Sequence, residues 1–143
     1  MKTTKTNDCK LITIDQIGDR RGHISVVENN KEVPFEVKRI YYLYDVPSGE
    51  ERGGHAHKDL EQLIIAVSGS FDVIVGDGET EKTFSLNRPN KGLYFTSGLW
   101  RKINNFSSGA ICLVLASHEY DEKDYIRNYN EFLSYKSDDL HSR

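Results

Sequence analysis

Apolar and polar residues alternate along most of this chain, with the period of two that a half-buried β-strand requires. Residues 71–75 show this pattern and run into Gly76-Asp77-Gly78, which is typical of a hairpin turn. Residues 111–116 are apolar on both faces, as expected for a strand in the middle of a sandwich or barrel. Further strands are expected at Leu11–Ile14, His23–Glu28, Val37–Asp45, Leu60–Val67, Lys82–Leu86, Gly92–Phe95 and Trp100–Phe106. Short strands about ten residues apart, separated by Gly, Pro, Asn and Asp, predict an all-β sandwich or small barrel.

The segment from Asp121 to Leu133 departs from the β pattern. Tyr125, Tyr129 and Phe132 fall on one helical stripe, and Asp121 is placed to cap a helix. We therefore expect one short C-terminal helix that closes the β domain and buries its aromatic stripe in the core. The polar ends, residues 1–9 and 134–143, are expected to be flexible, which leaves a single domain at residues 10–133.

The composition agrees with one folded domain and excludes several classes of protein. A chain of 143 residues hides roughly 70% of its unfolded surface on folding. Its 19 basic and 22 acidic side chains give a net charge of −3, without the clustered basic charge of a nucleic-acid-binding protein. No apolar run approaches the ~20 residues of a membrane span, and the N-terminus lacks the apolar core of a signal peptide. Cys9 and Cys112 are too few for a disulfide scaffold, so a cytoplasmic location is expected.

The candidate chemistry lies between Gly49 and Glu61. His55 and His57 are two residues apart, so on a strand both imidazoles point to the same face. Glu61 follows four residues later and could return to the same pocket after a bend. The spacing resembles the first cupin motif, except that the final gap before Gly69 is seven residues rather than six. Because a buried imidazole pair without partners is unfavourable, this pattern favours a functional pocket over a purely structural pair.

A metal-dependent cupin needs a further histidine from a second motif. The matching region, residues 92–105, contains none, and Arg101 lies near the expected position. Because a guanidinium stays cationic and repels a divalent metal, we expect neither a metal nor another cofactor. The two histidines then become candidates for general acid–base catalysis, since imidazole titrates near neutral pH.

Cationic and aromatic residues accompany the histidines. Arg39, Arg52 and Arg101 each lie in apolar or Gly-rich strand sequence, where an unpaired arginine is unfavourable. A glutamate could balance any one of them; the candidates are Glu28, Glu32, Glu51 and Glu61. Together they favour an anionic ligand held by side chains, because guanidinium suits bidentate phosphate contact and no glycine-rich phosphate loop is present. Tyr41 shares a strand face with Arg39 and could line the pocket. The other clustered aromatics are Tyr42, Tyr44, Tyr94, Phe95 and Trp100.

Five strings of residues carry a resemblance to a known family. They are Phe35-x-Val-Lys-Arg-Ile-Tyr-Tyr42, Arg52-Gly-x-His-x-His-Lys58, Leu60-Glu-Gln-Leu-Ile, Gly92-Leu-Tyr94 and Leu115-Ala-Ser-x-x-Tyr-Asp-Glu-x-Asp-Tyr-Ile-Arg-x-Tyr129. Together they resemble the WxcM-like cupin family of nucleotide-sugar 3,4-ketoisomerases. The resemblance covers about residues 10–133, and the last string is its most specific part.

The resemblance implies a cupin jelly roll that works without metal or other cofactor. It implies a homodimer with exchanged N-terminal strands, for which the polar connection at Asp15–Gly22 leaves room. The implied reaction moves the keto group of dTDP-4-keto-6-deoxy-D-glucose from C4 to C3 through an enediol. Its product would feed an aminotransferase that makes 3-amino-3,6-dideoxy sugars for surface polysaccharides such as the O-antigen of lipopolysaccharide.

Site residues follow from the same resemblance, position by position. His55 and His57 match the catalytic pair and Tyr41 the pocket tyrosine; we expect His55 to be the base, with the other two sharing proton delivery. Arg21 lies in a string, Asp19-Arg-Arg-Gly-His23, that resembles the family's turn beside the nucleotide pocket. Some relatives have Trp-His where this chain has Trp100-Arg101. The expected substrate contacts are Arg39, Arg52, Glu61, Arg101, Tyr94, Trp100 and Arg21.

Three alternatives stay open at this point. One is an enzyme like the dTDP-sugar 3,5-epimerases, whose family is longer and pairs its histidine with a Tyr and an Asp that have no clear counterpart here. The others are a metal-dependent cupin dioxygenase and a non-catalytic cupin that binds sugar nucleotides. The sequence also leaves open the nucleotide base, for which the resemblance implies thymidine, and the gluco or galacto configuration of the product at C4.

Overall fold

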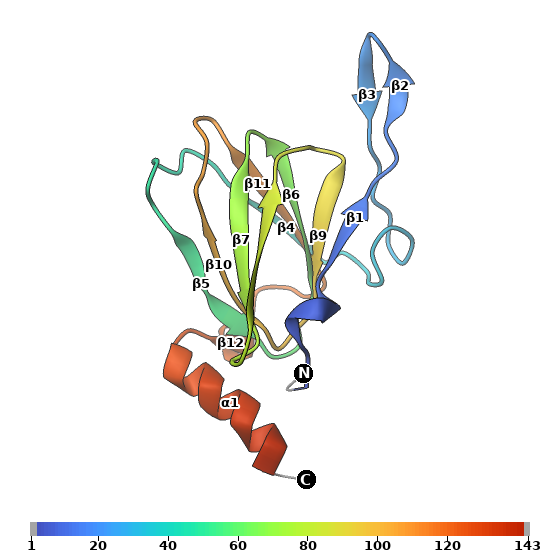
Figure 1. The fold of residues 1–143 in the computed structure, drawn as a ribbon. Coiled ribbons are helices and arrows are strands. Elements are labelled where there is room, and N and C mark those ends of the chain that lie inside the picture. The colour runs from blue at the N-terminus through green and yellow to red at the C-terminus, as the bar shows by residue number, and fades with distance from the viewer. Residues whose placement is uncertain (1–2, 142–143) are drawn as a thin grey trace.

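The computed structural model describes residues 3–141, which form two five-stranded antiparallel sheets facing each other (Figure 1). The first sheet contains, in spatial order, β1 (Lys10–Thr13), β9 (Lys91–Phe95), β6 (Gln62–Ser68), β11 (Ile111–Ala116) and β4 (Arg39–Leu43). The second sheet contains β12 (Tyr125–Ile126), β5 (Arg52–His57), β10 (Trp100–Asn104), β7 (Phe71–Gly76) and β8 (Glu81–Leu86). The predicted all-β sandwich or barrel with one C-terminal helix is therefore confirmed.

The core fills the space between the two sheets. In β7, the predicted alternation places Phe71, Val73 and Val75 in this core, each at most 1% exposed. In β11, Cys112 and Val114 also point inward. The intervening apolar residues of β11 pack on the outer face of the first sheet, where a second apolar cluster includes residues of the segment between β3 and β4. One apolar face of β11 therefore packs in the core between the sheets, and the other packs against the cluster on the outer face of the first sheet.

The residues before β1 pack against the barrel. They include a short 3-10 helix, η1 (Thr6–Asp8), and the side chains of Thr4 and Cys9 are buried. The Oγ1 of Thr4 donates to the carbonyl of Ser97 over 2.8 Å, and Nζ of Lys136 donates to the carbonyl of Thr4 over 2.8 Å. The packed part of the chain therefore begins before residue 10. Of the termini expected to be flexible, residues 1–2 and 142–143 lie outside the described residues.

The predicted helix over residues 121–133 is wrong in its position. Its first part is a 3-10 helix, η2 (Glu122–Asp124), followed by strand β12, and the α-helix α1 spans Tyr129–His141. The cap at Asp121 serves only η2, through a bond from the backbone N–H of Lys123. A second cap starts α1, because the Oδ1 of Asn128 accepts from the backbone N–H of Glu131. Within residues 3–141, no helix is long and apolar enough to cross a membrane.

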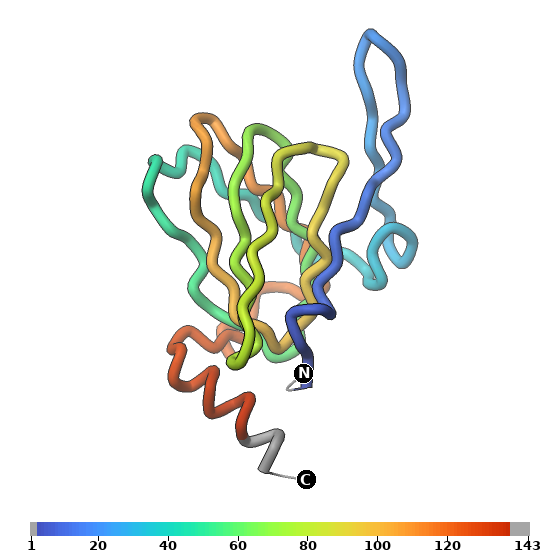
Figure 2. The backbone as a smooth tube through the Cα atoms, viewed as in Figure 1, coloured from blue at the N-terminus to red at the C-terminus, as the bar shows by residue number. Residues whose placement is uncertain are grey.

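A two-stranded hairpin projects from the barrel beside β1 (Figures 1 and 2). It consists of β2 (Ile17–Asp19) and β3 (Gly22–Ile24), which pair only with each other. The side chains of Ile17 and Ile24 are 57% and 65% exposed. The predicted strand at residues 23–28 is shortened accordingly, because the chain leaves the hairpin after Ile24.

Candidate active site

A cavity of about 260 Å³ is lined by side chains from both sheets. Its strongest feature is positive charge, since four arginines line it beside one histidine. The lining residues are Arg39, Tyr41, Leu43, Arg52, Gly53, His55, Arg101, Ile103, Tyr125 and Arg127. The set includes one predicted catalytic histidine, the predicted tyrosine and three of the predicted arginines.

Strand β5 carries both histidines to this region. His55 and His57 are 7% and 3% exposed, and their ring centroids lie 4.8 Å apart with the rings nearly perpendicular. The spacing of two residues on a strand accounts for this shared face. The ring of Tyr125 on the neighbouring strand β12 contacts both, at 5.1 Å from His55 and 4.3 Å from His57.

Arg101 connects the histidines to the first sheet. Its Nη2 donates to the hydroxyl of Tyr41 over 2.8 Å and lies 3.3 Å from Nε2 of His55. The Nε2 of Gln62 donates to the same hydroxyl over 3.0 Å. The register between β10 and β5 places Arg101 directly opposite His55, and this pairing brings the guanidinium to the imidazole.

The arginines of the cavity have unused donors. Within the part of the chain that the structure describes, the Nε and Nη2 of Arg39 and the Nε and Nη1 of Arg101 are buried without a hydrogen-bond partner. Among the glutamates that could have balanced them, Glu28 pairs with Lys31 and Glu51 with Lys102. Buried N–H groups are normally paired, so these donors fit an anionic ligand such as a phosphate.

Burial and the arginines also set the charge of the histidines. Burial, followed by repulsion from Arg101, lowers the pKa of His55 from 6.5 to about 2. The same two causes lower the pKa of His57, against an opposing effect of Asp124. Both imidazoles are therefore neutral at neutral pH and can accept protons.

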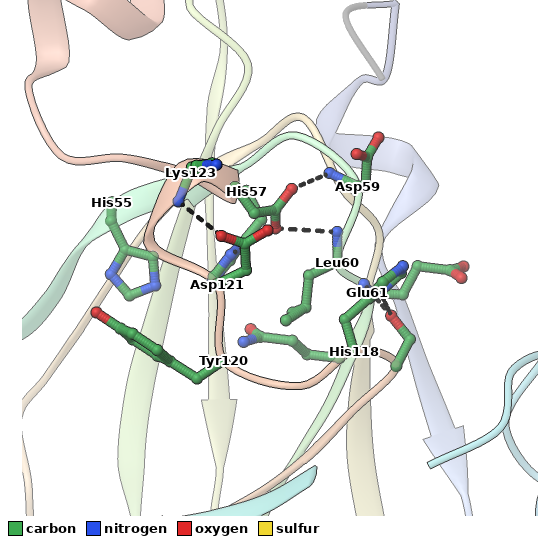
Figure 3. A network of polar contacts seen from close by, with 12 residues as sticks. His55, His57, Asp59, Leu60, Glu61, His118, Tyr120, Asp121 and Lys123 are labelled. Carbon is green, nitrogen blue, oxygen red and sulfur yellow. Dashed lines mark hydrogen bonds and ion pairs between the residues drawn. The ribbon is translucent and has the colours of Figure 1, made fainter. Parts of the chain in front are cut away.

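Asp124 holds the second histidine from outside the cavity. Its Oδ2 lies 3.1 Å from Nδ1 of His57, and its carboxylate also accepts the backbone N–H groups of Asp59 and Leu60. Figure 3 shows these two backbone contacts as dashed lines at Asp59 and Leu60. The exposed Tyr120 donates its hydroxyl to Glu122. Tyr120 also packs on the guanidinium of Arg39, with 5.5 Å between Cζ and the ring centroid.

Four predicted substrate contacts lie away from the cavity. Two of them, Glu61 and Tyr94, hydrogen-bond to each other. Alternation along β6 explains their position, because Gln62 faces the interior while Glu61 extends away from the histidines (Figure 3). A larger hollow beside Tyr94, of about 630 Å³, includes none of the unpartnered buried atoms found among the described residues.

The other two are separated from the cavity by their place in the fold. The ring of Trp100 packs on Tyr129 and Phe132 of α1, outside the barrel. Arg21 lies at the turn of the β2–β3 hairpin and forms an ion pair of 2.8 Å with Asp19.

Sequence reasoning missed several residues that the structure brings to the histidines, to Tyr41 or to the arginines of the cavity: Gln62, Tyr120, Asp124, Tyr125 and Arg127. Four of these belong to the string that ends at Tyr129, which was the most specific part of the family resemblance. Their role was hidden because the string was interpreted as a helix, whose tyrosines would pack in the core.

The donor set does not fit a divalent metal. Among the described residues, no three His, Cys, Asp or Glu side chains gather as possible ligands. The Nε2 of His55 faces the guanidinium of Arg101, a permanent cation, where a metal would have to bind. The expected absence of any cofactor stays a prediction.

Comparisons with known proteins agree with the resemblance. The model of a family described as FdtA, "WxcM-like, C-terminal", matches residues 7–137. The chain is 44% identical over 126 residues to the TDP-4-oxo-6-deoxy-alpha-D-glucose-3,4-oxoisomerase of Aneurinibacillus thermoaerophilus, a match that covers 88% of this chain and 91% of that protein.

Two solved structures have the same fold along almost their whole length. The WlaRB TDP-quinovose 3,4-ketoisomerase of Campylobacter jejuni is 52% identical with a TM-score of 0.85, over 89% of this chain and 98% of that one. A mutant of the 3,4-ketoisomerase QdtA of Thermoanaerobacterium thermosaccharolyticum, in complex with TDP-4-keto-6-deoxyglucose, is 38% identical with a TM-score of 0.89. That match covers 91% of this chain and 94% of QdtA. The predicted cupin jelly roll is thereby confirmed.

Proposed function

Because the chain belongs to the WxcM-like FdtA family, we propose that it is a 3,4-ketoisomerase acting on TDP-4-keto-6-deoxyglucose. One observation from the fold carries this proposal. Two neutral imidazoles lie side by side, and one of them, His55, lines a cavity whose arginines have unpaired donors. This arrangement supplies proton acceptors and an anion site together, and both are required by a keto sugar attached to a diphosphate.

The arginines are assigned to the TDP part of the substrate. Arg39, Arg52 and Arg127 line the cavity, and the unused donors of Arg39 can bind phosphate oxygens. Binding of the diphosphate would hold the sugar close to the histidines. Proton transfer between groups held in place in this way is faster than transfer between groups that must first meet in solution. The negative phosphates would also offset the arginine charges that lower the pKa of His55.

The histidines and Tyr41 are assigned to proton transfer. Moving the ketone from C4 to C3 requires a base that takes the proton from C3 and an acid that delivers one to C4. The proton of the 3-hydroxyl must also pass to the oxygen at C4. An enediolate forms between these steps, and its oxygens need hydrogen-bond donors. We assign the base to His55, and proton delivery and enediolate binding to His57 and Tyr41. Each positioned acid or base contributes roughly 10²–10⁴-fold to such a rate.

The direct test is incubation with TDP-4-keto-6-deoxyglucose in D₂O, followed by NMR of the product. We expect the carbonyl at C3 and one deuterium at C4. We expect the gluco configuration at C4, because a relative that is 52% identical is named a TDP-quinovose 3,4-ketoisomerase, and quinovose is 6-deoxyglucose. A ketone left at C4 with deuterium at C3 and C5 would indicate a 3,5-epimerase instead. An unchanged sugar at high enzyme concentration would indicate a binding protein.

Binding of the nucleotide can be tested separately by calorimetry with TDP. Arg39→Gln removes a guanidinium with unused donors, and charged hydrogen bonds contribute about 1.5–3 kcal/mol. We expect a roughly 10- to 100-fold weaker affinity for TDP. Arg88→Gln, at an exposed arginine between β8 and β9, is the matched control and should bind TDP as the wild type does. Equal affinities of both variants would contradict the assignment of Arg39.

We further propose that the protein works in the cytoplasm as a homodimer that exchanges its N-terminal β2–β3 hairpins. The strand first expected to cross to the partner, Leu11–Ile14, corresponds to β1, which pairs with β9 of its own chain. The projecting β2–β3 hairpin supports this, because Ile17 and Ile24 on it stay more than half exposed among residues 3–141. In such a dimer, Arg21 at the tip of the hairpin would act in the partner's site, which accounts for its distance from the cavity of its own chain.

A further inference from the structure

Asp124 and His57 form a contact that the proposed reaction does not yet use. The carboxylate of Asp124 accepts backbone N–H groups on both oxygens, from Asp59 over 2.8 Å and from Leu60 over 3.3 Å. The backbone carbonyl of Asp124 accepts in addition from the N–H of Lys58 over 3.0 Å. Three successive backbone N–H groups after His57 therefore bond to Asp124. These bonds restrict the movement of its carboxylate.

This geometry determines which nitrogen of His57 carries the proton. An ionised carboxylate can only accept hydrogen bonds, so the Nδ1 of His57, 3.1 Å from Oδ2, must be the donor. A neutral imidazole has one N–H, so its Nε2 carries a lone pair. That Nε2 is buried and has no hydrogen-bond partner among the described residues. This lone pair is therefore available for a proton, beside the ring of His55, which lines the cavity.

We propose that Asp124 is a positioning residue that fixes His57 in the tautomer with a bare Nε2 and stabilises the imidazolium formed when Nε2 takes a proton. The inference rests on the proposed function, in which His57 delivers a proton. With a bare Nε2, His57 first takes the proton of the 3-hydroxyl of the substrate and then delivers it to the oxygen at C4. Asp124 itself touches no reacting atom. It acts on the ring through Nδ1, at the side opposite to the nitrogen that exchanges protons.

The other charged groups near His57 make this carboxylate the stabilising partner. Arg101 from β10 and Arg39 from β4 both oppose a positive charge on the ring, and only Asp124 from η2 favours it. His55 and Tyr125, from β5 and β12, contact the ring as neutral groups. Removing the negative charge of Asp124 would therefore lower the pKa of His57 further.

The test is Asp124→Asn in the full chain, with Asp121→Asn as the matched control. An asparagine has only one acceptor oxygen, and we expect it to keep the shorter of the two backbone bonds, from the N–H of Asp59 to Oδ1 over 2.8 Å. The NH₂ group then replaces Oδ2 and faces Nδ1 of His57. Donation from that NH₂ group requires Nε2 to carry the proton. Asp121 caps the same 3-10 helix through the N–H of Lys123, and asparagine caps equally well.

Two measurements are expected to change together in Asp124→Asn. ¹⁵N NMR of the histidine ring should show the proton on Nδ1 in the wild type and on Nε2 in the variant. The kcat should fall by about 10²-fold, with little change in KM or in TDP affinity, and the acid limb of the kcat/KM profile should move to lower pH. Asp121→Asn should match the wild type in all five readouts, and Asp124→Glu should recover part of kcat.

Several outcomes separate the possibilities. An Nδ1–H tautomer retained in Asp124→Asn, with near-normal kcat, overturns the proposal. A fall in kcat with an unchanged tautomer and pH profile shows that Asp124 only supports the fold, which also overturns it. If the tautomer changes as expected but the wild type isomerises no TDP-4-keto sugar, the proposed function fails while the positioning of His57 by Asp124 stands.

Discussion

The two imidazoles at the cavity differ in what holds them. The Nε2 of His55 faces Nη2 of Arg101, and because a guanidinium can only donate, that nitrogen of His55 carries a lone pair. His57 is held at the other nitrogen, by the carboxylate of Asp124. Both rings therefore carry their proton on Nδ1, but only the lone pair of His57 is free of a partner among the described residues. A substrate that draws Arg101 toward its own oxygens would free the lone pair of His55 as well.

Replacement of His55 by asparagine tests its assignment as a proton-transfer group. Asparagine keeps the approximate size and hydrogen-bonding capacity of the imidazole but cannot act as a base near neutral pH. We expect kcat to fall by about 10²-fold or more. The affinity for TDP should change little, because the phosphates are assigned to arginines. Steady-state kinetics and calorimetry measure the two effects, and near-full turnover with lost TDP affinity would make His55 a binding residue.

Burial of the same histidine links stability to pH. The pKa of His55 is lowered to about 2 in the folded protein, whereas in the unfolded chain a histidine titrates near 6.5. Below about pH 6.5 the unfolded state therefore binds more protons than the folded state, and the free energy of unfolding falls as the pH drops. The contribution of neutral His55 to the free energy of unfolding is complete above the pKa of the unfolded state. It is lost progressively as the pH falls toward the pKa of the folded state.

Thermal unfolding as a function of pH measures this linkage. We expect the Tm to decrease as the pH falls from about 6.5 toward 4, and we expect His55→Asn to make that decrease less steep. Parallel slopes for the wild type and His55→Asn would show that the imidazole is not held neutral by the fold.

At the scale of elements, strands that are set by their own local pattern could be predicted from the sequence, whereas elements that are set by distant pairing could not. The alternation in β7 depends on burial of one face, so the pattern of residues 71–75 was sufficient to predict the strand. The segment 121–133 has a helical stripe, but its first part pairs with β5, where Tyr125 lies opposite His57. Pairing with a strand almost seventy positions away leaves no periodic trace in the sequence, so β12 and the role of Asp124 could not be found from it.

The same reasoning applies to the site. The spacing of His55 and His57 determines that they share a face, and the structure brings their rings together. Glu61 was expected beside them because it is close in sequence, yet the residue that reaches the site is its neighbour Gln62, which bonds to Tyr41. One step along a strand reverses the direction of a side chain, and the bend between β5 and β6 sets which residue of the two faces inward.

Packing of α1 on the second sheet can be tested through two aromatic residues of that helix. Phe132 is fully buried against Trp100, whereas Tyr129 contacts the same indole but is 45% exposed. We expect Phe132→Ala to reduce the free energy of unfolding by about 3–5 kcal/mol, because it leaves a cavity. Tyr129→Ala should cost clearly less, since half of its surface already contacts water. Denaturant titration measures both, and equal losses would contradict the packing described for α1.

At the scale of the whole molecule, the β2–β3 hairpin is the part that the single chain does not explain. A two-stranded hairpin is marginally stable by itself in water, and this one exposes Ile17 and Ile24 without packing on the barrel. A second copy that receives the hairpin would bury both side chains and would bring Arg21 from one chain to the other. Exchange of the hairpin between two chains therefore explains both the exposed isoleucines and the distance of Arg21 from the cavity of its own chain.

Ile24→Asp tests this assembly, because a buried unpaired carboxylate at the subunit contact is strongly unfavourable. Light scattering should give twice the mass of the chain for the wild type at micromolar concentration, and a mass shifted toward one chain for Ile24→Asp. Thr83→Asp adds the same charge to an exposed position of β8 and should leave the dimer intact. If Arg21 completes the partner's site, Ile24→Asp should also weaken TDP binding although the residue lies on the hairpin. A wild-type protein with the mass of one chain at all these concentrations would show that the hairpin has another purpose.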